Sequence, residues 1–221
     1  MCIEVRDERP SIPEVVIELP VHVSYPYLFE HGDSIYCVPE TRQAKEIALY
    51  RAEDFPHGWS KIATLVSSFP GLDSTIFQYQ GRWWLTSADG GSPSFNLFVW
   101  YAQNPLGPWN PHRLNPVKVD IRSSRPGGSP FMYGDHLYRP AQDCSKTYGW
   151  RIVINRITTL TPEEFEEERA AVVGPFANEP FPDGLHTLSA VGDITLIDGK
   201  RIVFSKGALK HTLQKAFSTI R

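Results

Sequence analysis

The sequence predicts an all-β fold of repeated strand–turn–strand units, a β-propeller, and three observations support this prediction. A glycine in a short polar turn is followed, three and four residues on, by two apolar residues, and this motif occurs four times. Apolar strands precede the turns, and a third strand follows the first three hairpins. Gly and Pro are frequent, at 16 and 19 of 221 residues, as a turn-rich β protein requires. The turn glycines are Gly32, Gly81, Gly134 and Gly199, at spacings of 49, 53 and 65 residues, close to the period typical of propeller blades.

The strands of each unit follow from the same pattern, because runs of Val, Ile, Tyr, Phe and Trp bounded by turn residues are typical of strands. Units one and two also close alike, on Trp59 and Trp109, which favours blades over the alternative, a generic β-sandwich. The first strands are expected at 25–29, 74–77, 129–133 and 188–197, and the third strands at 47–50, 97–101 and 152–157.

Three segments fall outside the repeat. Residues 15–19 have the composition of the last strand of a unit whose earlier strands are absent, so about four blades are readable and the N-terminal blade is missing or incomplete. The acidic run after Thr161 predicts either a short surface helix or a polar strand connection. Residues 208–221 have the apolar spacing of an amphipathic C-terminal helix. We expect one propeller domain over residues 1–221, with residues 1–20 as an irregular arm or closing strand.

Composition excludes several classes of function. The net charge of −3 shows no nucleic-acid footprint, and no window approaches the length of a membrane span. The N-terminus lacks a secretory signal, and the three widely spaced cysteines fit a reducing compartment, so we expect a cytoplasmic protein. An incomplete propeller exposes apolar faces and strand edges, so residues 15–19 or the C-terminal helix are expected to seal the gap or to form a homodimer.

Several segments carry a resemblance to a known family: residues 24–41 with 49–52, 73–77 with 81–85, 138–143, and 182–186 with 197–201. Over about residues 20–220 the chain resembles bacterial propeller proteins related to the N-terminal domain of plant glucosamine inositolphosphorylceramide transferases. That group in turn resembles the five-bladed propeller glycosidases: arabinanases, xylosidases, invertases and levansucrases. The resemblance implies a carbohydrate or glycoconjugate partner. It implies no cofactor, apart from a central cation that such propellers sometimes hold beside a histidine, here His186.

Glycoside hydrolysis needs two carboxyl groups across the sugar, and the repeat ranks the candidates. Asp73 opens the first strand of unit two, where the glycosidases have their inner carboxylate, although a residue that caps a turn is the alternative. Glu40 stands eight residues after its turn glycine, at the place of Gln142 in unit three, but could be a surface loop acid. Asp143 follows Gln142 directly.

The candidate substrate-binding residues are polar or aromatic side chains near the expected axis, and no metal-ligand spacing is present. A tyrosine can stack on a sugar face, while the other side chains can bind its hydroxyls. For His186 the alternative is a histidine satisfied within its strand. The set is Tyr25, Arg125, Arg139, Gln142 and His186.

Two functions remain open at this point. The first is an enzyme that hydrolyses or transfers a glycosyl unit at the axial funnel. The second is a non-catalytic carbohydrate-binding or assembly module. The resemblance places an inner Asp in the first blade of the glycosidases, and no equivalent Asp precedes residue 20. A two-carboxylate mechanism would therefore use Asp73 with Glu40 or Asp143.

Overall fold

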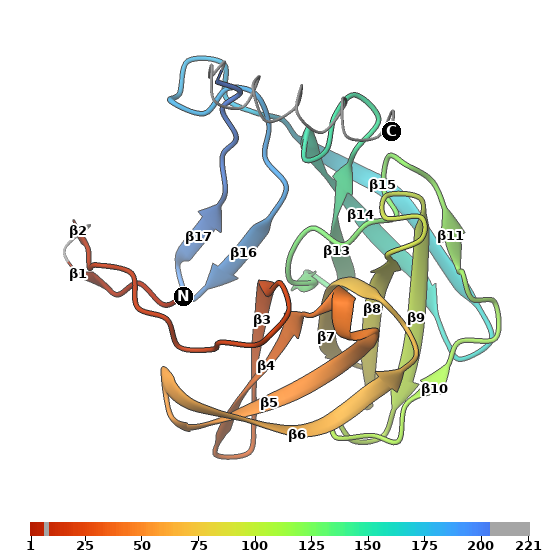
Figure 1. The fold of residues 1–221 in the computed structure, drawn as a ribbon. Helices are drawn as coiled ribbons and strands as arrows, with labels where there is room; N and C mark the ends of the chain where they lie inside the picture. The colour runs from red at the N-terminus through yellow and green to blue at the C-terminus, as the bar shows by residue number, and fades with distance from the viewer. Residues whose placement is uncertain (7–8, 204–221) are drawn as a thin grey trace, which may run out of the picture.

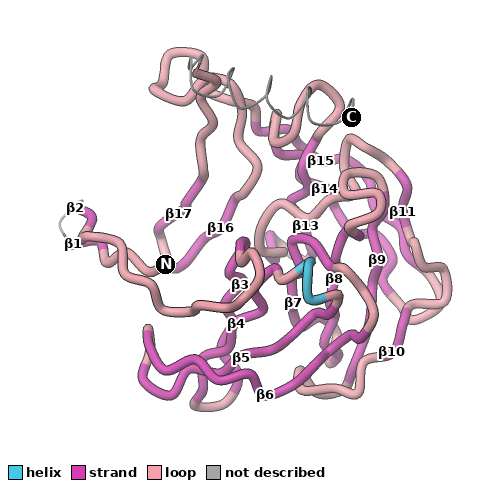
Figure 2. Tube along the Cα trace, in the orientation of Figure 1, coloured by secondary structure: helices cyan, strands magenta, loops and turns pink. Residues whose placement is uncertain are grey.

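A computed structural model describes residues 1–6 and 9–203, and these form β-strands joined by turns, with one 3-10 helix (Figures 1 and 2). The strands are β1 (Val5–Arg6), β2 (Arg9–Pro10), β3 (Ser24–His31), β4 (Ser34–Glu40), β5 (Glu46–Asp54), β6 (His57–Ser67), β7 (Gly71–Tyr79), β8 (Arg82–Asp89), β9 (Asn96–Ala102), β10 (Asn110–Pro111), β11 (Lys118–Val119), β12 (Phe131–Tyr133), β13 (His136–Asp143), β14 (Arg151–Leu160), β15 (Phe165–Val173), β16 (Leu188–Val191) and β17 (Ile194–Ile197). The 3-10 helix, η1, is Arg42–Ala44. No helix within the described ranges is long and apolar enough to span a membrane.

The strands form three large antiparallel sheets, each made from consecutive strands, as the repeat predicts. The first sheet has the order β3-β4-β5-β6, the second β7-β8-β9-β10 with β11 also on β9, and the third β12-β13-β14-β15. Two small hairpins, β1-β2 and β16-β17, stand apart from them. The expected first and third strands of units one to three fall inside these sheets, except that β12 begins at Phe131, two residues after the expected start at 129.

Two consecutive tryptophans join the three sheets into one body. Successive side chains of a strand point to opposite faces, so Trp83 and Trp84 on β8 face in opposite directions. Trp83 packs in a core cluster with Val38 and Leu49 of the first sheet. Trp84 packs in a second cluster with Leu137 and Ile157 of the third sheet. The second sheet is therefore the central layer, with apolar surface on both faces.

The first strands of sheets one and two share a β-bulge. Pairing of β3 with β4 shifts between Ser24 and Tyr27, and pairing of β7 with β8 shifts between Leu72 and Thr75. The residue after the outer paired position has a positive φ in both strands, 42° at Tyr25 and 50° at Asp73. A bulge changes the direction of a side chain, and this left-handed backbone is uncommon for residues other than glycine.

The prediction for the fourth unit is wrong about where its strands and its turn lie. Residues 188–197 are not one strand before a turn at Gly199; they are the whole hairpin β16-β17. Its turn contains Gly192, whose φ of 55° matches those of Gly32 and Gly134, at 57° and 58°. Gly199 does not have a positive φ. The apolar run on both sides of Gly192 hides the turn from a pattern search.

One further expectation needs correction, one of two open alternatives is confirmed, and one expectation lies beyond the described residues. Residues 15–19 form no strand; Ile17 and Leu19 instead pack on a small cluster that contains Cys37 and Tyr50 of the first sheet. The acidic run after Thr161 is the polar strand β15 rather than a helix, and the Thr161 hydroxyl accepts the backbone N–H groups of the turn before it. The C-terminal helix expected at 208–221 lies outside the described residues.

Candidate functional site

A polar pocket lies where the bulged ends of β3 and β7 and the end of β4 meet four connecting segments. Its volume is about 380 Å³. The bulges matter here because they direct side chains of the first and second sheets into the same space. The lining residues are His22, Ser24, Tyr25, Glu40, Asp73, Arg125, Tyr148, His186 and Thr187.

Asp73 is the best anchored acid of the pocket and is 4% exposed. Its Oδ2 accepts hydrogen bonds from Arg125 Nε at 2.6 Å and from Gln142 Nε2 at 2.7 Å. Gln142 is fully buried, and the same Nε2 also donates to the Pro126 carbonyl at 2.7 Å. A buried carboxylate needs such partners, and charge-assisted hydrogen bonds are the strongest available. Asp73 therefore holds the second sheet and the loop before β12 together at the pocket.

Glu40 is the second acid of the pocket, and it lies beside Asp73. The Asp73 backbone N–H donates to Glu40 Oε2 at 3.3 Å. The two side-chain carboxyls are also hydrogen-bonded to each other. Burial, the Asp73 charge and this shared hydrogen bond raise the pKa of Glu40 above its ordinary value. Two neighbouring carboxyl groups do not ionise together easily, and this effect favours the protonated form of Glu40.

A chain of contacts runs from Asp73 across the mouth of the pocket. The Arg125 guanidinium lies over the Tyr148 ring, 4.9 Å from its centroid, and the Tyr148 ring meets the His186 ring edge-on at 5.3 Å. His186 Nδ1 pairs with the Asp198 carboxylate. Burial disfavours the charged form of Arg125, but Asp73 outweighs it and raises the Arg125 pKa. Burial also raises the pKa of Tyr148 to about 12, so its phenol is neutral at pH 7.

Tyr25 enters the pocket from the bulge of β3. Its hydroxyl is 3.1 Å from the Thr75 hydroxyl on β7. Burial, then the nearby Asp73 charge, raises the pKa of the Tyr25 phenol. Tyr25 therefore stays a neutral phenol that bridges the first two sheets.

Most of the sequence-predicted site residues gather here. Tyr25, Glu40, Asp73, Arg125 and His186 line the pocket. Gln142 supports Asp73 from behind rather than facing the cavity. The repeat pattern predicts Asp73 and Glu40 from their positions in units two and one. The bulge of β7 and the pairing of β3 with β4 bring these two side chains together.

Two predicted site residues lie elsewhere. Asp143 accepts hydrogen bonds from the Ser145 backbone and from Arg151 Nε at 2.9 Å, and these partners outweigh burial and lower its pKa. An ionised, paired carboxylate outside the pocket is not suited to a general acid. Arg139 binds both Glu167 oxygens, at 2.6 and 2.9 Å, inside the third sheet. Its role is therefore structural.

Other lining residues were not predicted. His22, Ser24 and Thr187 carry no motif, because only the fold brings the N-terminal arm and the segment before β16 to the pocket. Within the described parts of the chain, no three His, Cys, Asp or Glu side chains cluster to hold a metal ion. The His186 imidazole, beside which the family resemblance allows a central cation, pairs with the Asp198 carboxylate and lines the same pocket as Glu40 and Asp73.

Comparison with solved structures shows the fold. "Xyloglucan PUL GH43B" of Bacteroides ovatus matches 80% of this chain and 35% of its own, with a TM-score of 0.53 and 20% identity. An exo-β-1,3-galactanase from Phanerochaete chrysosporium, solved with β-1,3-galactotriose, matches 82% of this chain and 44% of its own, with a TM-score of 0.55 and 13% identity. The chain shares the fold of these proteins, a β-propeller of the five-bladed glycosidase type, and its three large sheets are successive blades of that fold.

Comparison with curated sequences gives nearer relatives. Glucosamine inositolphosphorylceramide transferase 1 of Arabidopsis thaliana is 34% identical over 218 residues, which is 90% of this chain and 28% of the relative. The protein of the same name from Oryza sativa subsp. japonica is 41% identical over 152 residues, 66% of this chain and 20% of the relative. The chain thus spans between a fifth and three tenths of the length of these relatives. Residues 12–176 match the family described as "Glucosamine inositolphosphorylceramide transferase 1, N-terminal", and the chain belongs to that family.

Proposed function

We propose that the polar pocket binds a sugar unit of a carbohydrate or glycoconjugate without cleaving it. The observation that carries this proposal is the close approach of Glu40 to Asp73, whose backbone N–H donates to Glu40 Oε2 at 3.3 Å. Glycosidases hold their two carboxyl groups about 5 to 10 Å apart, so that the sugar lies between them. Glu40 and Asp73 are the two acids that line the pocket, and they are in contact with each other.

The remaining chemistry of the pocket suits recognition of sugar hydroxyls. Arg125 supplies donors, and the carboxyl oxygens of Glu40 and Asp73 supply acceptors. The exposed Tyr148 ring offers an apolar face at the mouth. A concave site with a few fixed polar groups is typical of small-ligand binding. The family and the propeller fold agree with a carbohydrate-related role.

Glycoside hydrolysis is the second candidate, favoured by one observation. The raised pKa of Glu40 is the property a general acid needs. For hydrolysis, Glu40 and Asp73 would have to separate when the sugar enters.

One experiment distinguishes the two. The protein is titrated by calorimetry with glucosamine, xylotriose and β-1,3-galactotriose, and each mixture is then analysed by mass spectrometry. We expect binding of at least one sugar with no cleavage. We expect Asp73→Asn to weaken binding by about tenfold, the worth of one lost charge-assisted hydrogen bond. Cleavage by the wild type that Asp73→Asn abolishes would replace the proposal by hydrolysis. No binding by any of the three sugars would contradict it.

A further inference from the structure

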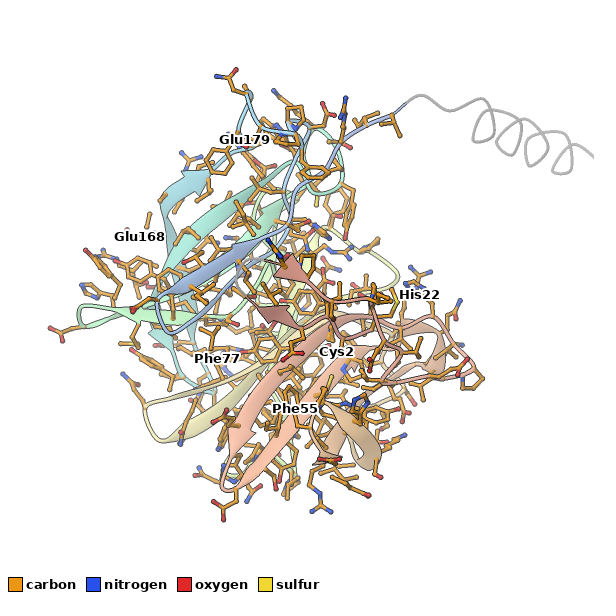
Figure 3. All side chains as sticks on the ribbon, turned by 90° about the vertical axis from the view of Figure 1, so that its left-hand side faces the viewer. Cys2, His22, Phe55, Phe77, Glu168 and Glu179 are labelled. Carbon is orange, nitrogen blue, oxygen red and sulfur yellow. The ribbon has the colours of Figure 1, made fainter. Side chains whose placement is uncertain are left out.

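A second pocket lies between the N-terminal arm and the outer face of the first sheet. Its volume is about 310 Å³. Met1, Cys2, Val16 and Ile17 of the arm form one wall. The opposite wall consists of β3 and β4 side chains and the turn between β5 and β6. Figure 3 shows Cys2 and Phe55, one from each wall, on the same side of the first sheet.

The second pocket is apolar. Apart from Ser24 and two thiols, its lining side chains are aliphatic, proline or aromatic. Burial raises the pKa of the Cys37 thiol to about 12, against the opposing effect of the N-terminal amine, so this thiol is neutral. No charged side chain lines the pocket. Its volume matches the smaller ligand sites of proteins, which suits a short alkyl chain or one aromatic ring.

The two pockets meet at the start of β3. Ser24 lines both of them. Neighbouring residues of β3 and β4 line different pockets. On β3, Tyr25 lines the polar pocket and Pro26 the apolar one; on β4, Glu40 lines the polar pocket and Pro39 the apolar one. β3 is the edge strand of its sheet, so no further strand of that sheet separates the two faces there. The two pockets are therefore adjacent at Ser24.

We propose that the apolar pocket holds the apolar aglycone of the same ligand whose sugar occupies the polar pocket. This inference rests on the proposed function. It specifies the ligand class as a glycoside with an alkyl or aryl group beside its sugar. The lining residue shared at Ser24 and the division into one polar and one mainly apolar cavity favour this occupant over a free sugar or a free hydrophobe.

The test measures affinity against alkyl length, with methyl, butyl, hexyl and octyl glycosides of glucose, galactose and xylose below their micelle concentrations. Each methylene that enters the apolar pocket should tighten binding by about fourfold until the pocket is full. Asp73→Asn should weaken every member of a series that binds by a similar factor. This combination would show that one ligand uses both pockets.

A matched pair of variants locates the apolar contact. Leu28 lines the apolar pocket and is 45% exposed, while Leu114 does not line it and is 48% exposed. Leu28→Gln should reduce the gain between methyl and octyl glycosides by at least fivefold, while Leu114→Gln leaves it unchanged. Thermal melts of both variants, expected close to the wild type, check that they fold.

The outcomes separate this inference from the proposed function. Equal affinity at every alkyl length overturns the inference and leaves sugar binding intact. If affinity rises with alkyl length but Leu114→Gln reduces this rise as much as Leu28→Gln does, the inference is also overturned, because the alkyl group then binds outside the apolar pocket. Binding of octanol as tight as that of the octyl glycosides, with no effect of Asp73→Asn, shows a hydrophobe site unrelated to sugar. No binding by any glycoside overturns both proposals.

Discussion

Replacing Arg139 by methionine should destabilise the protein strongly without touching the polar pocket. The Arg139 and Glu167 side chains are 1% and 2% exposed. Arg139 also donates to the carbonyls of Ser123 and Ser124, at 2.6 and 3.3 Å. Arg139→Met leaves a buried carboxylate with Lys118 as its remaining cationic partner and leaves two carbonyls without this donor. Removing one partner of a buried ion pair typically costs about 3–5 kcal/mol.

Urea unfolding measures this loss. With a slope of about 2 kcal/mol per molar urea, a loss of about 4 kcal/mol lowers the midpoint by about 2 M. Lys61→Met is the control, because Lys61 and Glu46 form a more exposed pair, 39% and 24% exposed, which is worth about 1 kcal/mol or less. Arg139→Met with Glu167→Gln should lose about 1–3 kcal/mol less than the sum of the two single changes. An Arg139→Met protein with wild-type stability but impaired sugar binding would refute this reasoning and return Arg139 to the site.

Three further changes test the site and the turns. Because the pKa of Glu40 is raised in the folded protein, its contribution to stability is full below the ordinary value of 4.5 and is lost as pH rises through the folded pKa. Glu40→Gln should therefore flatten the fall in the urea midpoint as pH rises. An unchanged dependence of the midpoint on pH would contradict this prediction. Hydrogen bonds outweigh burial and lower the pKa of Asp198 from 3.8 to about 2. The stabilisation that Asp198 provides is therefore present above pH 3.8 and is lost as pH falls towards 2. Asp198→Asn should remove this loss of stability at low pH, and circular dichroism of both proteins at low pH measures the difference. A Cβ on Gly128 would lie 1.7 Å from the Leu188 carbonyl oxygen, whereas a Cβ on Gly134 meets nothing within 4 Å. Gly128→Ala should therefore lower the melting temperature much more than Gly134→Ala does. Equal effects would show that the cost of both substitutions comes from the positive φ alone and not from the contact.

The sequence predicts the three large sheets because each has its own turn glycine and its own run of apolar residues. It fails at the fourth unit, where the turn at Gly192 lies inside an apolar run that reads as one strand. Asp73 and Glu40 could be found because the repeat assigns them places at comparable ends of two units. Arg125 and Arg139 could not be told apart, since the partner of each lies far away in sequence. Asp73 is 52 residues from Arg125, and Glu167 is 28 residues from Arg139.

β3 and β7 have the same bulge, and its residue faces the pocket, while the paired residues on either side of it hold the sheet together. Tyr25 and Asp73 occupy the same place in their strands, yet one is a neutral aromatic and the other an acid. The backbone fixes where the side chain points, while the strand pairs on either side stay the same. A substitution at either position would therefore change the side chain that the pocket receives, and at Asp73 it would also remove the partner of the buried Arg125. Exchanging the residue types between Tyr25 and Asp73 would move the acid from one sheet to its neighbour.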